Sequence, residues 1–144
     1  MNVLVTGSEG LIGRSVCPAL LRRGHSIVPV DLITHGVDLA QAIPPSLFRG
    51  IDAVVHLAGK LASVAAQRAR GFDLLARNLR IDLNLLEAAK AAEVRRGVYA
   101  STVSVYPEGG YRMDEADATG ILAHSVRFSA WGKLTAERLI EAWA

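Results

Sequence analysis

Cysteine is nearly absent from this sequence of 144 residues, because Cys17 is the only one. An intramolecular disulfide and a cysteine metal cluster are therefore excluded, and a reducing cytoplasm is the expected location. An excess of one charge is also lacking: the formal net charge is +2, and the basic residues lie in scattered pairs such as Arg22–Arg23 and Arg95–Arg96. So small and dispersed a charge does not indicate a nucleic-acid-binding protein.

Long apolar runs are missing as well. No run reaches the roughly 18 apolar residues that a membrane-spanning helix needs, and the apolar start MNVLVTG is too short for a signal peptide. We therefore expect no membrane association. Hydrophobic residues nevertheless make up 51% of the chain, which favours a folded domain with a real core over disorder. The length indicates one domain, residues 1–144.

Short apolar segments alternate with segments of helical character. The predicted strands are residues 2–6, 26–31, 52–57 and 97–101, and the predicted helices are residues 11–23, about 74–93, and about 129 to the C-terminus. Apolar strands that alternate with helices are typical of an α/β fold with a parallel sheet. Gly24 is expected to end the first helix, and Pro18 to remove one hydrogen bond within it.

The segment from Asp31 to Asp38 is unusually short for such a fold. Parallel neighbours need a crossover of about a dozen residues or more, and LITHGV looks too short for a helix. Either the residues around Val37 are not a full strand, or the usual second helix is absent. We expect four firm parallel strands and a fragmentary fifth near residues 36–38.

Three glycines, Gly7, Gly10 and Gly13, lie between the first predicted strand and the first predicted helix, in TGSEGLIG. Gly7 would allow a tight turn, Gly10 would let the backbone approach a pyrophosphate, and Gly13 would let the helix pack close to the strand. The helix N-terminus would offer unpaired N–H groups to phosphates. We assign these glycines, with Leu11 and Ile12 of the same loop, to a dinucleotide site; the alternative is a turn that merely contains glycines.

An acidic residue stands where such a site needs one. Asp31 ends the second predicted strand, 18 residues after Gly13. There its carboxylate can accept hydrogen bonds from the adenosine ribose and would repel a 2′-phosphate, which favours NAD over NADP. The alternative is that Asp31 is an ordinary surface residue.

These motifs together resemble the extended short-chain dehydrogenases/reductases, the NAD-dependent epimerase/dehydratase family. TGSEGLIG is similar to the family's TGxxGxxG loop, HLAG (residues 56–59) to its cofactor-lining strand end, and KLTAE (residues 133–137) to its KLxxE helix. The resemblance covers nearly the whole chain. It implies a Rossmann-like doubly wound parallel sheet, truncated here after the helix that carries Lys133, and the absence of the family's C-terminal substrate region.

The resemblance also assigns individual residues. It implies that the carboxylate of the Asp38–Leu39 pair meets the adenine, that Leu57, Ala58 and Gly59 line the cofactor, and that Asn78 braces the active site. In the family, a tyrosine activated by a lysine four residues later exchanges a proton with a substrate hydroxyl, while NAD exchanges a hydride at the same carbon. A serine or threonine, here Thr102, holds the substrate oxygen.

The chain departs from this pattern at the tyrosine. Lys133 matches the family lysine, but Ser129 stands four residues before it. Tyrosine with a pKa near 10 needs a nearby ammonium to act as a base at neutral pH, and a serine cannot replace it in that role. Losing a general acid/base typically costs about 10²–10⁴ in rate. Lys133 could still bind the nicotinamide ribose, which is its other role in the family. The catalytic set is therefore Thr102, Lys133 and Ser129, with Lys133 also in the cofactor set.

Three hypotheses follow. The chain is an NAD-dependent oxidoreductase or epimerase acting on a nucleotide-sugar or a similar substrate, or a catalytically silent NAD-binding or interaction module, or a fragment of a longer enzyme. The resemblance implies a homodimer built by the two long helices. The histidines His25, His35, His56 and His124 lack metal-ligand spacing and are interpreted as loop or strand-end residues, so we expect no metal. Cys17 is interpreted as a small core residue.

Overall fold

The computed structural model describes residues 1–106 and 128–143, so His124 lies outside the described residues, as does the side chain of Ser129. The chain divides into two compact units. One comprises Met1–Gly59 and Arg80–Ala100, and the other comprises Lys60–Leu79 and Ser101–Ala144. In the described ranges, no helix has the length and apolar character that crossing a membrane requires.

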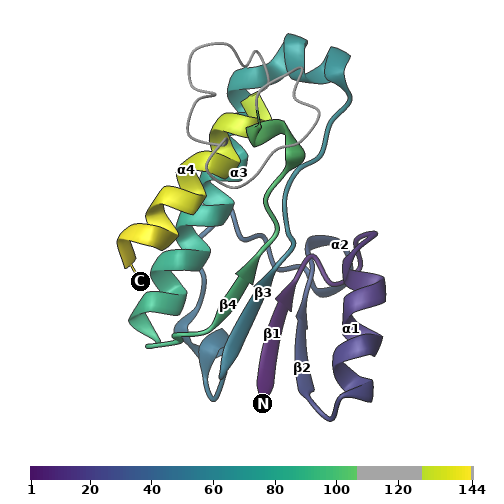
Figure 1. The fold of residues 1–144 in the computed structure, drawn as a ribbon, viewed down its shortest axis with the longest axis vertical. Coiled ribbons are helices and arrows are strands. Elements are labelled where there is room, and N and C mark those ends of the chain that lie inside the picture. The colour runs from purple at the N-terminus through teal and green to yellow at the C-terminus, as the bar shows by residue number, and fades with distance from the viewer. Residues whose placement is uncertain (107–127, 144) are drawn as a thin grey trace. The chain divides into compact units, whose positions relative to one another are not determined.

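A four-stranded parallel sheet forms the centre of the first unit (Figure 1). Its strands are β1 (Asn2–Thr6), β2 (Ser26–Val30), β3 (Ala53–His56) and β4 (Gly97–Tyr99), in the spatial order β2-β1-β3-β4. Thr6 pairs with both Val30 and His56, and His56 pairs with Tyr99. The carboxyl ends of all four strands are therefore level, at the edge where open α/β sheets bind their ligands.

Helices cover the sheet on both faces. Helix α1 (Gly13–Arg22) connects β1 to β2, and helix α3 (Val64–Ala91) connects β3 to β4 on the opposite side of β1. The step from β1 to β2 moves one way across the sheet, and the step from β3 to β4 moves the other way. Because both crossovers are right-handed, their helices lie on opposite faces of the sheet. The predicted doubly wound α/β fold is thus confirmed.

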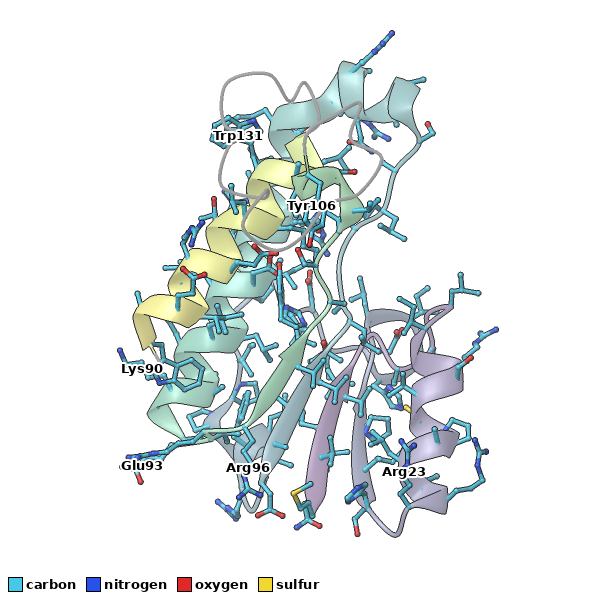
Figure 2. The ribbon with its side chains drawn as sticks, in the orientation of Figure 1. Arg23, Lys90, Glu93, Arg96, Tyr106 and Trp131 are labelled. Carbon is cyan, nitrogen blue, oxygen red and sulfur yellow. The ribbon has the colours of Figure 1, made fainter. Side chains whose placement is uncertain are left out.

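The core of the first unit is built from strand residues and from the second half of α3. Its buried apolar side chains come from β1, β2, β3, α3 and the β2–β3 connection: Val3, Leu4, Val5, Val30, Leu39, Phe48, Ile51, Val54, Ile81, Leu85 and Ala89. At the far end of α3, Glu93 adopts a left-handed backbone with φ 58°. Glu93 and Arg96 both lie on the surface there (Figure 2).

The short segment after β2 corrects two expectations. Residues Leu32–His35 form a single helical turn, α2, although LITHGV was expected to be too short for a helix. The Asp31 side chain caps its start and Gly36, with φ 67°, ends it, and these two caps make so short a turn possible. Residues 36–38 form no strand, so the expected fragmentary fifth strand is wrong for the described sheet. The chain continues through a 3₁₀ turn, η1 (Pro45–Phe48), to β3.

Helix α3 begins ten residues earlier than predicted. It runs over Val64–Ala91 and is interrupted at Arg70, whose backbone is non-helical with φ −135° and ψ 36°. Gly71 follows directly, and glycine weakens a helix interior. The interruption is why the helical pattern could not be followed back from residue 74. β4 is also two residues shorter than predicted, and α1 begins at Gly13, not at Leu11.

The second unit contains the first part of α3, the 3₁₀ turn η2 (Val103–Val105) and helix α4 (Phe128–Trp143). Val105 and Leu134 are buried against each other, and Tyr106 packs on them. A Cβ at Gly132 would lie 3.2 Å from Cδ1 of Leu75, so the glycine brings α4 close to α3 within this unit. Tyr106, near η2, and Trp131, on α4, are labelled in Figure 2.

Candidate functional site

The glycine loop forms a tight turn that only glycine can make at two of its positions. Gly7 has φ 64°, and a Cβ there would lie 2.9 Å from the backbone N of Ala58. A Cβ at Gly13 would lie 2.2 Å from the carbonyl oxygen of Gly7. Gly7 therefore lets β1 turn against the end of β3, and Gly13 lets α1 start against that turn. These are the roles that the sequence assigned to the two glycines.

The start of α1 presents a row of backbone donors. Gly10 N–H donates to Gly7 O at 3.0 Å, and Arg14 N–H donates to Gly10 O at 3.1 Å. Within residues 1–106 and 128–143, the N–H groups of Leu11, Ile12 and Gly13 have no hydrogen-bond acceptor, and Ile12 provides no side-chain cap. Uncapped N–H groups at a helix N-terminus, together with the helix dipole, are suited to an anion.

The side chains of this loop include one residue that sequence reasoning missed. The Ser8 hydroxyl is buried and has no partner among the described residues, although buried polar groups normally find one. Glu9, also in the loop, forms a 3.6 Å ion pair with Arg14. Both charged side chains are largely exposed, so this pair contributes little to stability.

Asp31 lies at the carboxyl end of β2, as predicted, and has a structural task that was not predicted. Its Oδ1 accepts a hydrogen bond from Ile33 N–H at 2.9 Å, which caps α2. Its backbone carbonyl accepts from His35 N–H at 3.1 Å. Asp31 therefore organises the turn that follows β2. Its carboxylate lies at the carboxyl end of that strand.

Asp38 and Leu39 lie in the connection between β2 and β3. Asp38 Oδ1 accepts from Ala40 N–H at 3.0 Å, and the Leu39 side chain is buried in the core. Asn84 of α3 holds this segment by donating to the carbonyls of Leu39 and Gln41, both at 3.0 Å. The segment is thus held in two ways: the Leu39 side chain is buried in the core, and Asn84 binds its backbone carbonyls.

Leu57, Ala58 and Gly59 follow β3 and lie beside the glycine turn. The N–H groups of Leu57 and Ala58 both donate to the Thr6 hydroxyl at 3.2 Å, and Leu57 N–H also reaches Thr6 O. Gly59 is exposed. The end of β1 therefore holds the backbone that the resemblance assigns to the cofactor.

A buried polar chain continues from Thr6, and sequence reasoning did not find it. Thr6 Oγ1 lies 2.6 Å from His56 Nδ1, and His56 Nε2 lies 2.9 Å from Asp82 Oδ1. Tyr99 O–H donates to Asp82 Oδ2 at 2.9 Å. Thr6, His56 and Asp82 are all buried. His56 was interpreted only as a strand-end residue; it does end β3, but Asp82 is 26 residues away, and no local pattern joins the two.

Asn78, in the second unit, holds the backbone of Lys60, whereas its bracing of an active site stays a prediction. Its Oδ1 accepts from Lys60 N–H at 2.7 Å, and its Nδ2 donates to Lys60 O at 3.1 Å. One side chain thereby satisfies both backbone polar groups of a residue that lies just before α3.

The residues assigned to catalysis also belong to the second unit. Thr102 caps η2, because its Oγ1 accepts from Ser104 N–H at 3.3 Å. Ser129 lies in the first turn of α4, and the half-buried Lys133 follows four residues later. Ser101 donates a short hydrogen bond to Glu137 of α4, and Val105 packs against Leu134. The elements that carry Thr102 and Lys133 are therefore joined by a polar and an apolar contact.

Cys17 is half-buried on α1 and is not the buried core residue that was expected. Burial, with a smaller effect of the Glu9 carboxylate, raises the pKa of the Cys17 thiol. No group of three His, Cys, Asp or Glu side chains in the described ranges is arranged to hold a metal ion.

Comparisons with known proteins agree on one family. The model described as "NAD dependent epimerase/dehydratase family" matches residues 3–144. A UDP-glucose 4-epimerase of Klebsiella pneumoniae is 30% identical over 132 residues, covering 74% of this chain and 92% of that sequence. A 3-beta-hydroxysteroid dehydrogenase of Mycolicibacterium neoaurum is 32% identical over 151 residues, covering 89% of this chain and 38% of that sequence.

Solved structures lead to the same result. The protein MoeE5, in complex with UDP-glucose and NAD, superposes with a TM-score of 0.86 at 31% identity, covering 99% of this chain and 49% of that chain. Apart from the Klebsiella sequence, the chain thus spans half or less of these relatives' length. With its glycine turn, its level strand ends and a family match over residues 3–144, this chain belongs to the NAD-dependent epimerase/dehydratase family.

Proposed function

We propose that this chain binds NAD through its glycine loop and acts in the conversion of a nucleotide-sugar. The observation that carries the proposal is the row of donors at Leu11, Ile12 and Gly13, which have no acceptor among the described residues. Three adjacent N–H groups beside the Gly7 turn suit the pyrophosphate of a dinucleotide, which the helix dipole also attracts. NAD is the cofactor that the family's description names.

Asp31 supports NAD over NADP. One carboxylate oxygen, Oδ1, caps α2, and we assign Oδ2 to the ribose hydroxyls. A 2′-phosphate at the same place would meet this negative charge, so NADP should bind more weakly. We further propose that Asp38, Leu57, Ala58 and Gly59 line the adenine and the nicotinamide portions, in the roles that the resemblance implies.

The substrate proposal rests on the relatives. The Klebsiella relative is a UDP-glucose 4-epimerase, and MoeE5 was solved with UDP-glucose. A nucleotide-sugar with a hydroxyl or keto group is therefore the substrate class to test first. Thr102 would hold the reacting oxygen, and Lys133 would bind the nicotinamide ribose.

A catalytically silent NAD-binding module is the second candidate, and Ser129 is the observation that favours it. A serine at the tyrosine position removes the group whose phenol would carry the proton. Under this proposal the chain binds NAD and does not transfer a hydride unless another protein segment supplies an acid/base.

Calorimetric titration with NAD+ and NADH, followed by a hydride-transfer assay over a panel of nucleotide-sugars, tests both candidates. Binding with turnover supports the enzyme, and binding without turnover supports the silent module. Failure of both dinucleotides to bind contradicts both. A homodimer through α3 and α4, and a cytoplasmic location, remain proposals. Leu139 on α4 is 39% exposed and suits such an interface, which sedimentation analysis would test.

A further inference from the structure

Four polar side chains, three of them buried and Tyr99 half-buried, form one continuous hydrogen-bonded chain at the carboxyl ends of three neighbouring strands. Thr6 ends β1, His56 ends β3 and Tyr99 ends β4. Thr6 contacts His56, and His56 and Tyr99 both contact Asp82 of α3. The exposed fractions are 0% for Thr6 and 3% for both His56 and Asp82. Since an unsatisfied buried polar group is costly, each polar hydrogen of these four side chains needs a hydrogen-bond acceptor.

The direction of each hydrogen bond follows from counting donors and acceptors. A threonine hydroxyl has one proton and two lone pairs, and two N–H groups point at the lone pairs of Thr6: that of Ala58, and that of Leu57, which is shared with Thr6 O. Thr6 must then donate its proton to His56 Nδ1. The imidazole proton is therefore on Nε2, which donates to Asp82 Oδ1, while Tyr99 donates to Asp82 Oδ2.

This order of Thr, His and Asp resembles the triads of hydrolases, but its geometry excludes nucleophilic attack. Thr6 Oγ1 has no exposed surface to meet a substrate, because the residue is 0% exposed. Its lone pairs are occupied by two amides, whereas a nucleophile needs one available for attack. What the chain does hold in place is the backbone of Leu57 and Ala58, which lies against the Gly7 turn.

We propose that Thr6, His56, Asp82 and Tyr99 are positioning residues for NAD, which fix the Leu57–Ala58 backbone against the Gly7 turn. The proposal rests on the proposed function, since it takes the glycine loop as the NAD site. A Cβ at Gly7 would lie only 2.9 Å from Ala58 N, so any shift of this backbone displaces the turn that starts α1. Asp82 acts from the interior by fixing the tautomer of His56, and through it the orientation of the Thr6 hydroxyl.

The first experiment needs no cofactor. Two-dimensional ¹H–¹⁵N NMR of the imidazoles, assigned by substituting His25, His35 and His124 in turn, should show His56 protonated on Nε2. Amide exchange at Leu57 and Ala58 should be about 10-fold faster in Thr6→Val, the loss expected for a buried hydrogen bond, and should return towards the wild-type rate in Thr6→Ser. An Nδ1-protonated His56, or unchanged exchange in a folded Thr6→Val, would overturn the proposal.

The second experiment measures NAD affinity by calorimetry in Thr6→Val, Thr6→Ser and Tyr99→Phe, each first shown to be folded by circular dichroism. Tyr99→Phe removes only one hydroxyl and keeps the ring. We expect NAD to bind about 10-fold more weakly to Thr6→Val and about 3-fold more weakly to Tyr99→Phe, with Thr6→Ser close to wild type. If Thr6→Val and Tyr99→Phe both fold and both bind NAD with wild-type affinity, the proposal is overturned. If the wild-type chain itself fails to bind NAD, the proposed function fails, and the tautomer and exchange data still decide whether the backbone is held.

Discussion

Asn78 and Lys60 exchange two hydrogen bonds, in which the side-chain amide of one satisfies both backbone polar groups of the other. Asn78→Asp keeps the acceptor Oδ1 but replaces the donor Nδ2 with an oxygen that faces the Lys60 carbonyl. We expect this variant to be less stable by about 0.5–1 kcal/mol, because the Lys60 carbonyl loses its donor and faces a carboxylate, while water can reach this exposed residue and replace part of the lost bond. Urea unfolding followed by circular dichroism measures the change.

A useful comparison for Asn78→Asp is Asn78→Ala, which removes both bonds without adding a facing oxygen. If the two hydrogen bonds between Asn78 and Lys60 stabilise the fold, Asn78→Asp should be at least as unstable as Asn78→Ala. Wild-type stability in both variants would show that the pair contributes nothing.

Gly7→Ala should abolish measurable NAD binding while the sheet still forms. The new Cβ would lie 2.9 Å from backbone atoms of Leu57 and Ala58, at a residue with φ 64°. Gly24→Ala is a matched control: φ is 76° there, but the added Cβ meets nothing within 4 Å. Both substitutions carry the left-handed strain of about 1 kcal/mol, and only the first displaces the loop. Equal NAD affinity in the two variants would argue against the glycine-loop site.

Asp31→Asn should separate the two tasks of Asp31. Asparagine can still cap α2 with its Oδ1, so we expect the stability to remain within about 0.5 kcal/mol of wild type. The loss of negative charge should weaken NAD binding and narrow the preference for NAD over NADP. Calorimetry with both dinucleotides measures the two affinities. An unchanged ratio would mean that the carboxylate does not meet the ribose.

Ser129→Tyr should restore the missing general acid/base four residues before Lys133. If the chain binds both NAD and a nucleotide-sugar, we expect hydride transfer to rise by about 10²-fold or more, the lower end of the usual contribution of such a group. Ser129→Phe adds similar bulk without the hydroxyl and should remain at the wild-type rate. An equal rise in both variants would assign the effect to packing.

Alkylation of Cys17 by iodoacetamide should show a pH profile shifted to higher pH than that of the same chain unfolded in urea. Burial and the Glu9 carboxylate raise the pKa of this thiol, so less reactive thiolate is present at any pH below that pKa. Glu9→Gln should move the profile part of the way back. The midpoint of the rate–pH curve, which does not depend on how accessible the sulfur is, is the quantity to compare.

Much of the fold could be predicted because its signals are local. The apolar run and the glycine after it predict β1 at residues 2–6, and the glycine spacing between a strand and a helix, with an acid after the second strand, predicts the dinucleotide loop. The break at Arg70 and the turn α2 were missed, because each depends on caps and dihedral angles that override helix propensity. For the candidate site, the residue types pointed to a dinucleotide, but the chain from Thr6 to Tyr99 joins residues far apart in sequence, and only folding brings them together.

Pro29 affects how readily the sheet can pair with a second molecule. β2 lies at one margin of the described sheet. Ser26 N and Val30 O bond towards β1, and because residues alternate along a strand, the backbone of Pro29 faces outward. Its missing N–H therefore costs no bond within the sheet and deprives an approaching strand of a donor. Pro29 thus hinders the pairing of this apolar edge strand with a strand of a second molecule, which is a route to aggregation. Pro29→Val would restore the missing donor and make such pairing easier.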